Sequence, residues 1–213
     1  MLNEKEIRKT IALMKPEGQL FEVRVIYGNK AMYSGYFTNA DDLMRAFDEL
    51  RNFADCNIYM SLNSINTACY DRIQKNRFEK NAKATTSDHD VVGYDWLMID
   101  LDPKRPSGTS STDEQIEKAK EQGNKIYQFM RNLGFSKPLF ANSGNGVHLL
   151  YRIRLKNSDE NRKLIEMSLK TLNMLFASPE IDVDMKNFNQ SRVCKLYGTT
   201  AQKGRIRTLD RIV

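Results

Sequence analysis

Two aspartates, Asp100 and Asp102, end an apolar run that begins at Trp96, and Pro103 follows them directly. In a β-strand, side chains two positions apart leave the same face, so the two carboxylates are expected to project side by side. Two carboxylates that close repel each other unless a proton or a cation lies between them. Because all the ligands are oxygens, Mg²⁺ or Mn²⁺ is favoured. The spacing indicates a metal-dependent site, although an Asp-x-Asp pair also occurs in surface turns, Ca²⁺ loops and sugar transferases.

A glycine-rich segment, Ser143-Gly144-Asn145-Gly146, precedes a strand-like run that carries His148, one of only two histidines in the chain. Glycine-rich turns let backbone amides approach an anion closely. The histidine side chain, one residue into the strand, could donate a hydrogen bond to a phosphate oxygen. The structural alternative is a tight hairpin followed by a histidine that is satisfied within the sheet.

A third carboxylate near the first two is offered by Asp182 or Asp184, which alternate along one short apolar segment. The spacing by itself does not choose between them. Arg192 and Lys203 follow, and they suit a triphosphate because arginine presents a two-pronged fork and lysine a point charge. These residues together predict a site that holds both a divalent cation and phosphate groups.

The positive charge of the chain is concentrated at its carboxy-terminal end. Residues 1–184 contain 26 Lys+Arg and 26 Asp+Glu, whereas residues 185–213 contain 7 basic residues and 1 acidic residue, so the whole formal charge of +6 arises there. The segment also contains apolar residues and turn formers, which favours a folded segment over a solvated tail. A folded basic strip beside an acidic site indicates a nucleotide or nucleic-acid ligand.

The elements that must position these residues follow from periodicity and capping signals. Helices are expected at 3–14, after the N-cap Asn39, from the capping box Ser111–Glu114 to about Leu133, and at about 158–177. Strands are expected at Phe21–Tyr27, Ala31–Phe37, Cys56–Leu62, 95–102, Pro138–Ala141 and Val147–Ile153. Residues 64–90 are polar and are interpreted as a surface loop. This order predicts an α+β fold with helices on one side of a sheet.

Composition places the chain among soluble globular proteins of the cytoplasm. No window approaches 18 uninterrupted apolar residues, so no membrane span is expected. The amino terminus is charged and lacks the apolar segment of a secretion signal. Three scattered cysteines match neither a disulfide framework nor a zinc site.

The three motifs, in this order and at this separation, resemble those of the archaeo-eukaryotic primase superfamily, in particular the primase-polymerases of phages and mobile elements. The first motif of that family is the Asp-x-Asp pair, and the second is a strand-borne histidine after a glycine-rich turn. The third is an apolar residue and Asp, then Asn and Arg, then Leu-x-Gly-Thr, which favours Asp184 over Asp182. The matching positions are Asp184, Asn189, Arg192, Leu196, Gly198 and Thr199.

The resemblance implies an RRM-like antiparallel sheet core with flanking helices and an N-terminal α/β appendage. It implies one catalytic domain over residues 1–213, with the appendage at 1–90 and the motifs at 91–213, either as a small stand-alone member or as a fragment of a longer protein. Asp100, Asp102 and Asp184 are expected to be catalytic and to hold two divalent ions, Mg²⁺ or Mn²⁺. The expected nucleotide-binding residues are Ser143, Gly144, Asn145, Gly146, His148, Arg192, Lys195 and Lys203.

The implied activity is DNA-templated primer synthesis and extension from NTP or dNTP, on a single-stranded DNA template and with a replicative helicase in cis or in trans. A non-catalytic single-stranded nucleic-acid-binding module is the main alternative, and it leaves the three carboxylates without a role. A nicking endonuclease of the His-hydrophobic-His type needs a histidine pair that His89 and His148 do not form. A sugar transferase shares only the Asp-x-Asp pair.

Overall fold

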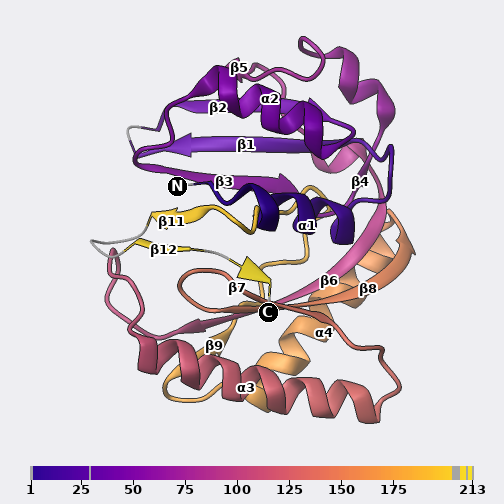
Figure 1. Cartoon of the computed structure of the whole chain (residues 1–213). Coiled ribbons are helices and arrows are strands. Elements are labelled where there is room, and N and C mark those ends of the chain that lie inside the picture. Colours follow the sequence, from indigo (N-terminus) through magenta and orange to yellow (C-terminus); the bar gives the residue numbers. More distant parts are fainter. Residues whose placement is uncertain (1, 29, 203–206, 210, 213) are drawn as a thin grey trace.

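The computed structural model describes residues 2–28, 30–202, 207–209 and 211–212, with side chains through Gln202 (Figure 1). This part of the chain forms an α+β fold, as expected, in which every strand pair is antiparallel. Its α-helices are α1 (Glu4–Met14), α2 (Ala40–Leu50), α3 (Asp113–Asn132) and α4 (Asp159–Phe176).

The first sheet has the strand order β10-β3-β1-β2-β5. Its strands are β1 (Phe21–Tyr27), β2 (Met32–Phe37), β3 (Cys56–Ser61), β5 (Glu79–Lys80) and β10 (Val193–Lys195). Four of these come from the N-terminal part of the chain, and β10 comes from the third motif region. A strand from the far end of the sequence therefore completes the sheet of the N-terminal portion.

The second sheet has the order β13-β7-β8-β6-β4, and β9 also pairs with β6. Its strands are β4 (Ser64–Ile65), β6 (Val91–Pro103), β7 (Leu139–Asn142), β8 (Val147–Lys156), β9 (Ile181–Val183) and β13 (Arg211–Ile212). A two-stranded ribbon, β11 (Thr200–Gln202) with β12 (Arg207–Leu209), links β10 to β13. The chain thus crosses from one sheet to the other after the third motif.

The two faces of β6 pack against different layers, and this decides where the first motif points. Leu97 and Ile99 are buried in the cluster that contains α3 and α4, the helices on the outer side of the second sheet (Figure 1). Trp96 and Met98 are buried in the cluster shared with the first sheet. Because side chains alternate along a strand, Asp100 continues the face of Trp96 and Met98. The first motif therefore faces the space between the sheets.

Most helix boundaries lie where the local capping signals predict them. The Asn39 side chain accepts a hydrogen bond from Asp42 N–H at 2.8 Å, and Gly134 follows α3 with φ +89°. The capping box of α3 was placed one residue too early: it is formed by Thr112 and Gln115.

The expectation of an irregular loop at 64–90 was only partly correct. This stretch contains two short strands, β4 and β5, and two 3-10 turns, Thr67–Asp71 and Asp88–Asp90. The two strands pair with β6 and β2, which lie elsewhere in the chain, so no local periodicity reveals them. Within the described ranges, no helix is long and apolar enough to cross a bilayer.

Candidate active site

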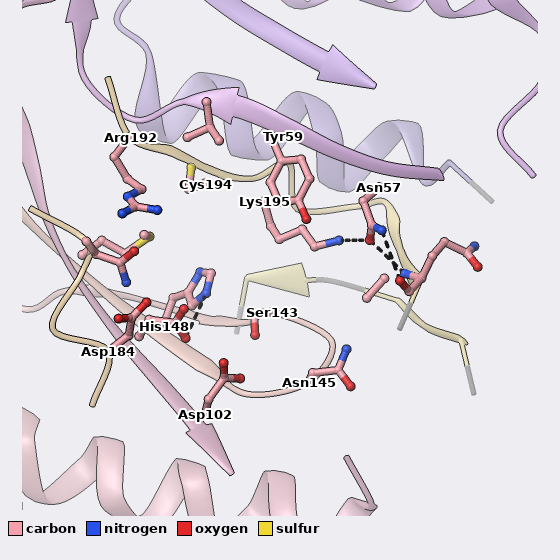
Figure 2. A pocket seen from close by; sticks show the side chains of 16 residues that line it. Asn57, Tyr59, Asp102, Ser143, Asn145, His148, Asp184, Arg192, Cys194 and Lys195 are labelled. Carbon is pink, nitrogen blue, oxygen red and sulfur yellow. Dashed lines mark hydrogen bonds and ion pairs between the residues drawn. The ribbon is translucent and has the colours of Figure 1, made fainter. Parts of the chain in front are cut away.

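A pocket of about 290 Å³ opens between the two sheets and collects most of the residues expected from the sequence (Figure 2). The second sheet supplies the floor of the pocket, which carries the carboxylates. The opposite wall is formed by β3 and β10 of the first sheet and by β11 of the two-stranded ribbon. Sixteen residues line it: Asn57, Tyr59, Met98, Asp100, Asp102, Ser143, Asn145, His148, Asp184, Asn187, Arg192, Val193, Cys194, Lys195, Ala201 and Gln202.

The three carboxylates meet at the floor through strand pairing. Asp100 and Asp102 lie on β6, and the backbone N–H of Asp184, directly after β9, donates to the carbonyl of Asp100 at 2.9 Å. Asp182 pairs with Asp102 in the register of β9 and β6, but its carboxylate forms an ion pair with Lys104 at 3.1 Å and does not line the pocket. Of the two alternatives left open by spacing, Asp184 is the one placed in the pocket.

His148 is held between a carboxylate and a tyrosine. It pairs with Asp100 in the register of β8 and β6, so the two side chains share a face, and its Nε2 lies 3.4 Å from Asp100 Oδ1. Its Nδ1 lies 2.6 Å from the hydroxyl of Tyr197. The Tyr197 ring is fully buried in the core and is therefore not available to stack on a base. Trp96 is buried as well.

The glycine-rich turn connects β7 to β8 and lies close to the first motif. Ser143 N–H donates to the Gly146 carbonyl at 3.1 Å, and Gly144, at φ +89°, donates its N–H to the Asn142 side chain at 2.8 Å. A Cβ at Gly146 would lie 2.3 Å from the Leu101 carbonyl oxygen. The two glycines therefore shape the turn.

Ser143 and Asn145, the other two residues of this turn, line the pocket themselves. The Asn145 side chain accepts a hydrogen bond from Ser111 N–H at 3.0 Å. Ser111, which was expected to cap α3, instead ties the start of that helix to the turn.

The opposite wall carries the basic residues. Arg192 donates from its guanidinium to the Lys186 carbonyl, and Lys195 Nζ donates to Asn57 Oδ1 at 2.6 Å. Among the described residues, the buried donors Arg192 Nε and Asn187 Nδ2 have no hydrogen-bond partner. Buried polar groups are nearly always paired, so these two donors are available to an acceptor in the pocket. Lys203, also expected here, lies outside the described residues.

Two residues of this wall, Asn57 and Tyr59, were not anticipated. Their i, i+2 spacing on β3 puts them on one face, but nothing local connects β3 with motifs that begin at Asp100. The link is the pairing of β10 with β3, which sets Lys195 directly opposite Tyr59, with the ammonium 5.1 Å from the ring centroid.

Cys194, which also lines the pocket, is 2 % exposed, and burial raises the pKa of its thiol to about 12. The thiol is therefore neutral at physiological pH and is not an activated nucleophile.

Whether the floor suits a divalent cation depends on donor type and on arrangement. The three carboxylates are the hard oxygen ligands that Mg²⁺ and Mn²⁺ prefer, so the donor set fits by its chemistry. Within the described part of the chain, however, no group of three or more His, Cys, Asp or Glu side chains is arranged to hold a metal ion. The side chains of Asp100, Asp102 and Asp184 would therefore have to move to share one.

Comparison with known proteins relates the fold to a primase. No family model and no curated protein matches the chain. Among solved structures, it is similar to the crystal structure of primase RepB', with a TM-score of 0.52 and 11 % identity over 99 % of this chain and 55 % of that one. The chain thus spans about half the length of that protein. A structure of the catalytic domain of primase RepB' in complex with initiator DNA matches with a TM-score of 0.46 and 10 % identity, over 93 % and 78 % of the two chains.

Proposed function

We propose that this chain is a primase-polymerase that synthesises and extends primers on DNA by nucleotidyl transfer from NTP or dNTP to a 3′-hydroxyl. The observation that carries the proposal is one pocket with three carboxylates on its floor and Arg192 and Lys195 on the opposite wall. A nucleoside triphosphate with its divalent cations needs acidic side chains to bind the cations and basic side chains to bind the phosphates, close to one another. The primase-like fold supports the same function.

The basic wall binds the triphosphate. Arg192 offers a planar fork and Lys195 a point charge, and both neutralise charge that shifts toward the leaving pyrophosphate in the transition state. The buried donors Arg192 Nε and Asn187 Nδ2 favour an anionic ligand here. Ser143 and Asn145 border the same space from the glycine-rich turn.

The acidic floor would hold the divalent cations. Two divalent ions bound by Asp100, Asp102 and Asp184 would supply Lewis-acid activation of the 3′-hydroxyl and stabilisation of the pyrophosphate. The hydroxyl of Tyr197 fixes His148 so that its Nε2 stays beside Asp100. This support keeps the imidazole in the pocket, where it adds a polar contact to the nucleotide.

The proposed partners follow from the reaction. A single-stranded DNA template would lie along basic surface of the carboxy-terminal segment, so binding should weaken as salt rises. The biological setting we propose is replication of a phage, plasmid or other mobile element, with a helicase that acts in cis or in trans.

The test is incubation with single-stranded DNA, Mn²⁺ and one labelled nucleotide of each sugar type, without primer. Asp184→Asn, which keeps the shape of the side chain and its contact with Lys186 N–H, should abolish the product ladder. Asp182→Asn is the matched control, because this carboxylate does not line the pocket, and it should leave the ladder intact. DNA binding without any incorporation by the unmodified protein would favour a non-catalytic binding module.

A further inference from the structure

Asn57 makes three hydrogen bonds that join three strands at the edge of the pocket. Its Oδ1 accepts from Lys195 Nζ at 2.6 Å and from Gln202 N–H at 2.9 Å, and its Nδ2 donates to the Gln202 carbonyl at 3.1 Å. The side chain therefore ties β3 to both β10 and β11. Figure 2 shows Asn57, Tyr59 and Lys195 together on this wall, with dashed lines for the hydrogen bonds of Asn57 to Lys195 and to Gln202.

These contacts restrict a side chain that is otherwise flexible. A lysine ammonium is a compact charge on a four-carbon stem, and ordering it costs rotamer entropy. Here the ammonium is held by the Asn57 carbonyl oxygen and also lies 5.1 Å from the centre of the Tyr59 ring, within the range of a cation–π interaction. Lys195 therefore has its charge fixed at the pocket wall before any ligand binds.

We propose that Asn57 is a positioning residue that holds the Lys195 ammonium where the triphosphate binds, an inference that rests on the proposed function. Asn57 acts through Lys195 because both ends of its amide are already engaged by protein groups. Fixing the cation in advance removes an ordering cost from ligand binding, so the expected effect is on phosphate affinity.

The test is a double-mutant cycle on the binding of inorganic tripolyphosphate, measured by calorimetry in Mg²⁺ buffer with the full chain. Asn57→Ala should weaken binding about tenfold, the size of the rotamer-ordering cost that an unrestrained lysine would then incur on binding. In the Lys195→Ala background the same substitution should change the dissociation constant less than about twofold, because the residue through which it acts is absent. Equal effects in both backgrounds would overturn the inference, as would failure of the unmodified protein to bind tripolyphosphate.

Two further variants separate positioning from general stability. Asn157→Ala is the matched control: its side-chain amide also bonds to backbone groups, donating to the carbonyls of Asp88 and Val91, but lies outside the pocket. It should lower the melting temperature without changing tripolyphosphate affinity. Asn57→Asp keeps the oxygen that accepts from Lys195 and from Gln202 N–H and loses the donor to the Gln202 carbonyl, and its charge neutralises the ammonium. Affinity should fall at least as far as in Asn57→Ala, and unchanged affinity would refute the inference.

Primer extension measured in parallel distinguishes this inference from the proposed function. If the cycle shows coupling but no variant incorporates nucleotides, the assignment of Asn57 stands and the polymerase proposal fails. If the unmodified protein extends primers and the cycle is additive, the polymerase proposal stands and Asn57 has no positioning role.

Discussion

Gly146→Ala should damage both the fold and the candidate site, because the turn touches β6 between the two carboxylates of the first motif. An added Cβ would lie 2.3 Å from the Leu101 carbonyl oxygen and 3.0 Å from Asp102 Oδ1. Carbon–oxygen contacts in proteins are about 3.3 Å or longer, so the turn or β6 must move by about 1 Å. The obstacle is a backbone atom inside a sheet, which cannot rotate away as a flexible side chain can.

The displacement sets the size of the effect. Overpacking of this kind costs about 1–3 kcal/mol of unfolding free energy, which for a chain of this length lowers the melting temperature by about 2–12 °C. A shift of about 1 Å at the reacting groups reduces the rate about a hundredfold. We therefore expect a folded but unstable protein whose nucleotide incorporation falls by about two orders of magnitude at a temperature where it remains folded.

Gly108→Ala is the control for this experiment. Gly108 has φ +79° and no atom within 4 Å of an added Cβ, so alanine there costs only left-handed backbone strain of about 1–2 kcal/mol. Thermal unfolding and single-turnover incorporation should be measured for both variants. Similar melting temperatures with a large rate loss only in Gly146→Ala are expected. Full activity and unchanged stability in Gly146→Ala would refute the close approach on which the reasoning depends.

Three other perturbations have defined outcomes. Replacing both Asp100 and Asp102 by Asn should reduce incorporation about a thousandfold or more and remove the thermal stabilisation by Mn²⁺, while circular dichroism stays unchanged; residual primer extension by this variant would show that the site is misassigned. Tyr197→Phe removes the hydroxyl next to His148, so nucleotide affinity should fall about fivefold in titrations, the equivalent of about 1 kcal/mol. Burial lowers the pKa of Lys15 to about 8 from 10.5, so between these pH values the unfolded chain holds the extra proton and stability rises with pH. In urea titrations, the free energy of unfolding of the unmodified protein, relative to that of Lys15→Met, should rise by up to about 3 kcal/mol from pH 8 to 10.5. A pH-independent difference between the two free energies would contradict this expectation.

Local sequence patterns were sufficient to predict the features that depend on contacts within a few residues. The i, i+2 spacing put Asp100 and Asp102 on one face of β6, and the cap at Asn39 and the stop at Gly134 follow from contacts within a few residues. The α+β class follows from the order of these elements. All of these depend on backbone geometry that a short segment carries with it.

Pairing between segments distant in the sequence decided which residues line the pocket and which are buried in the core. Asp182 and Asp184 have the same local character, and only the register of β9 against β6, with the ion pair to Lys104, separates them. Tyr197 lies in the third motif region, and only the packing of that region into the core shows that its ring is buried.

Residue types and local spacing predict which groups are available for chemistry: an acidic pair on a strand, a histidine after a glycine-rich turn, and a basic carboxy-terminal segment. Which of these groups lie close together depends on the tertiary structure. The insertion of β10 beside β3 brings Lys195 over the carboxylate floor and adds Asn57 and Tyr59, which no motif contains. The physical reason is that side-chain direction repeats with a local period, whereas strand partners are chosen by burial over the whole chain.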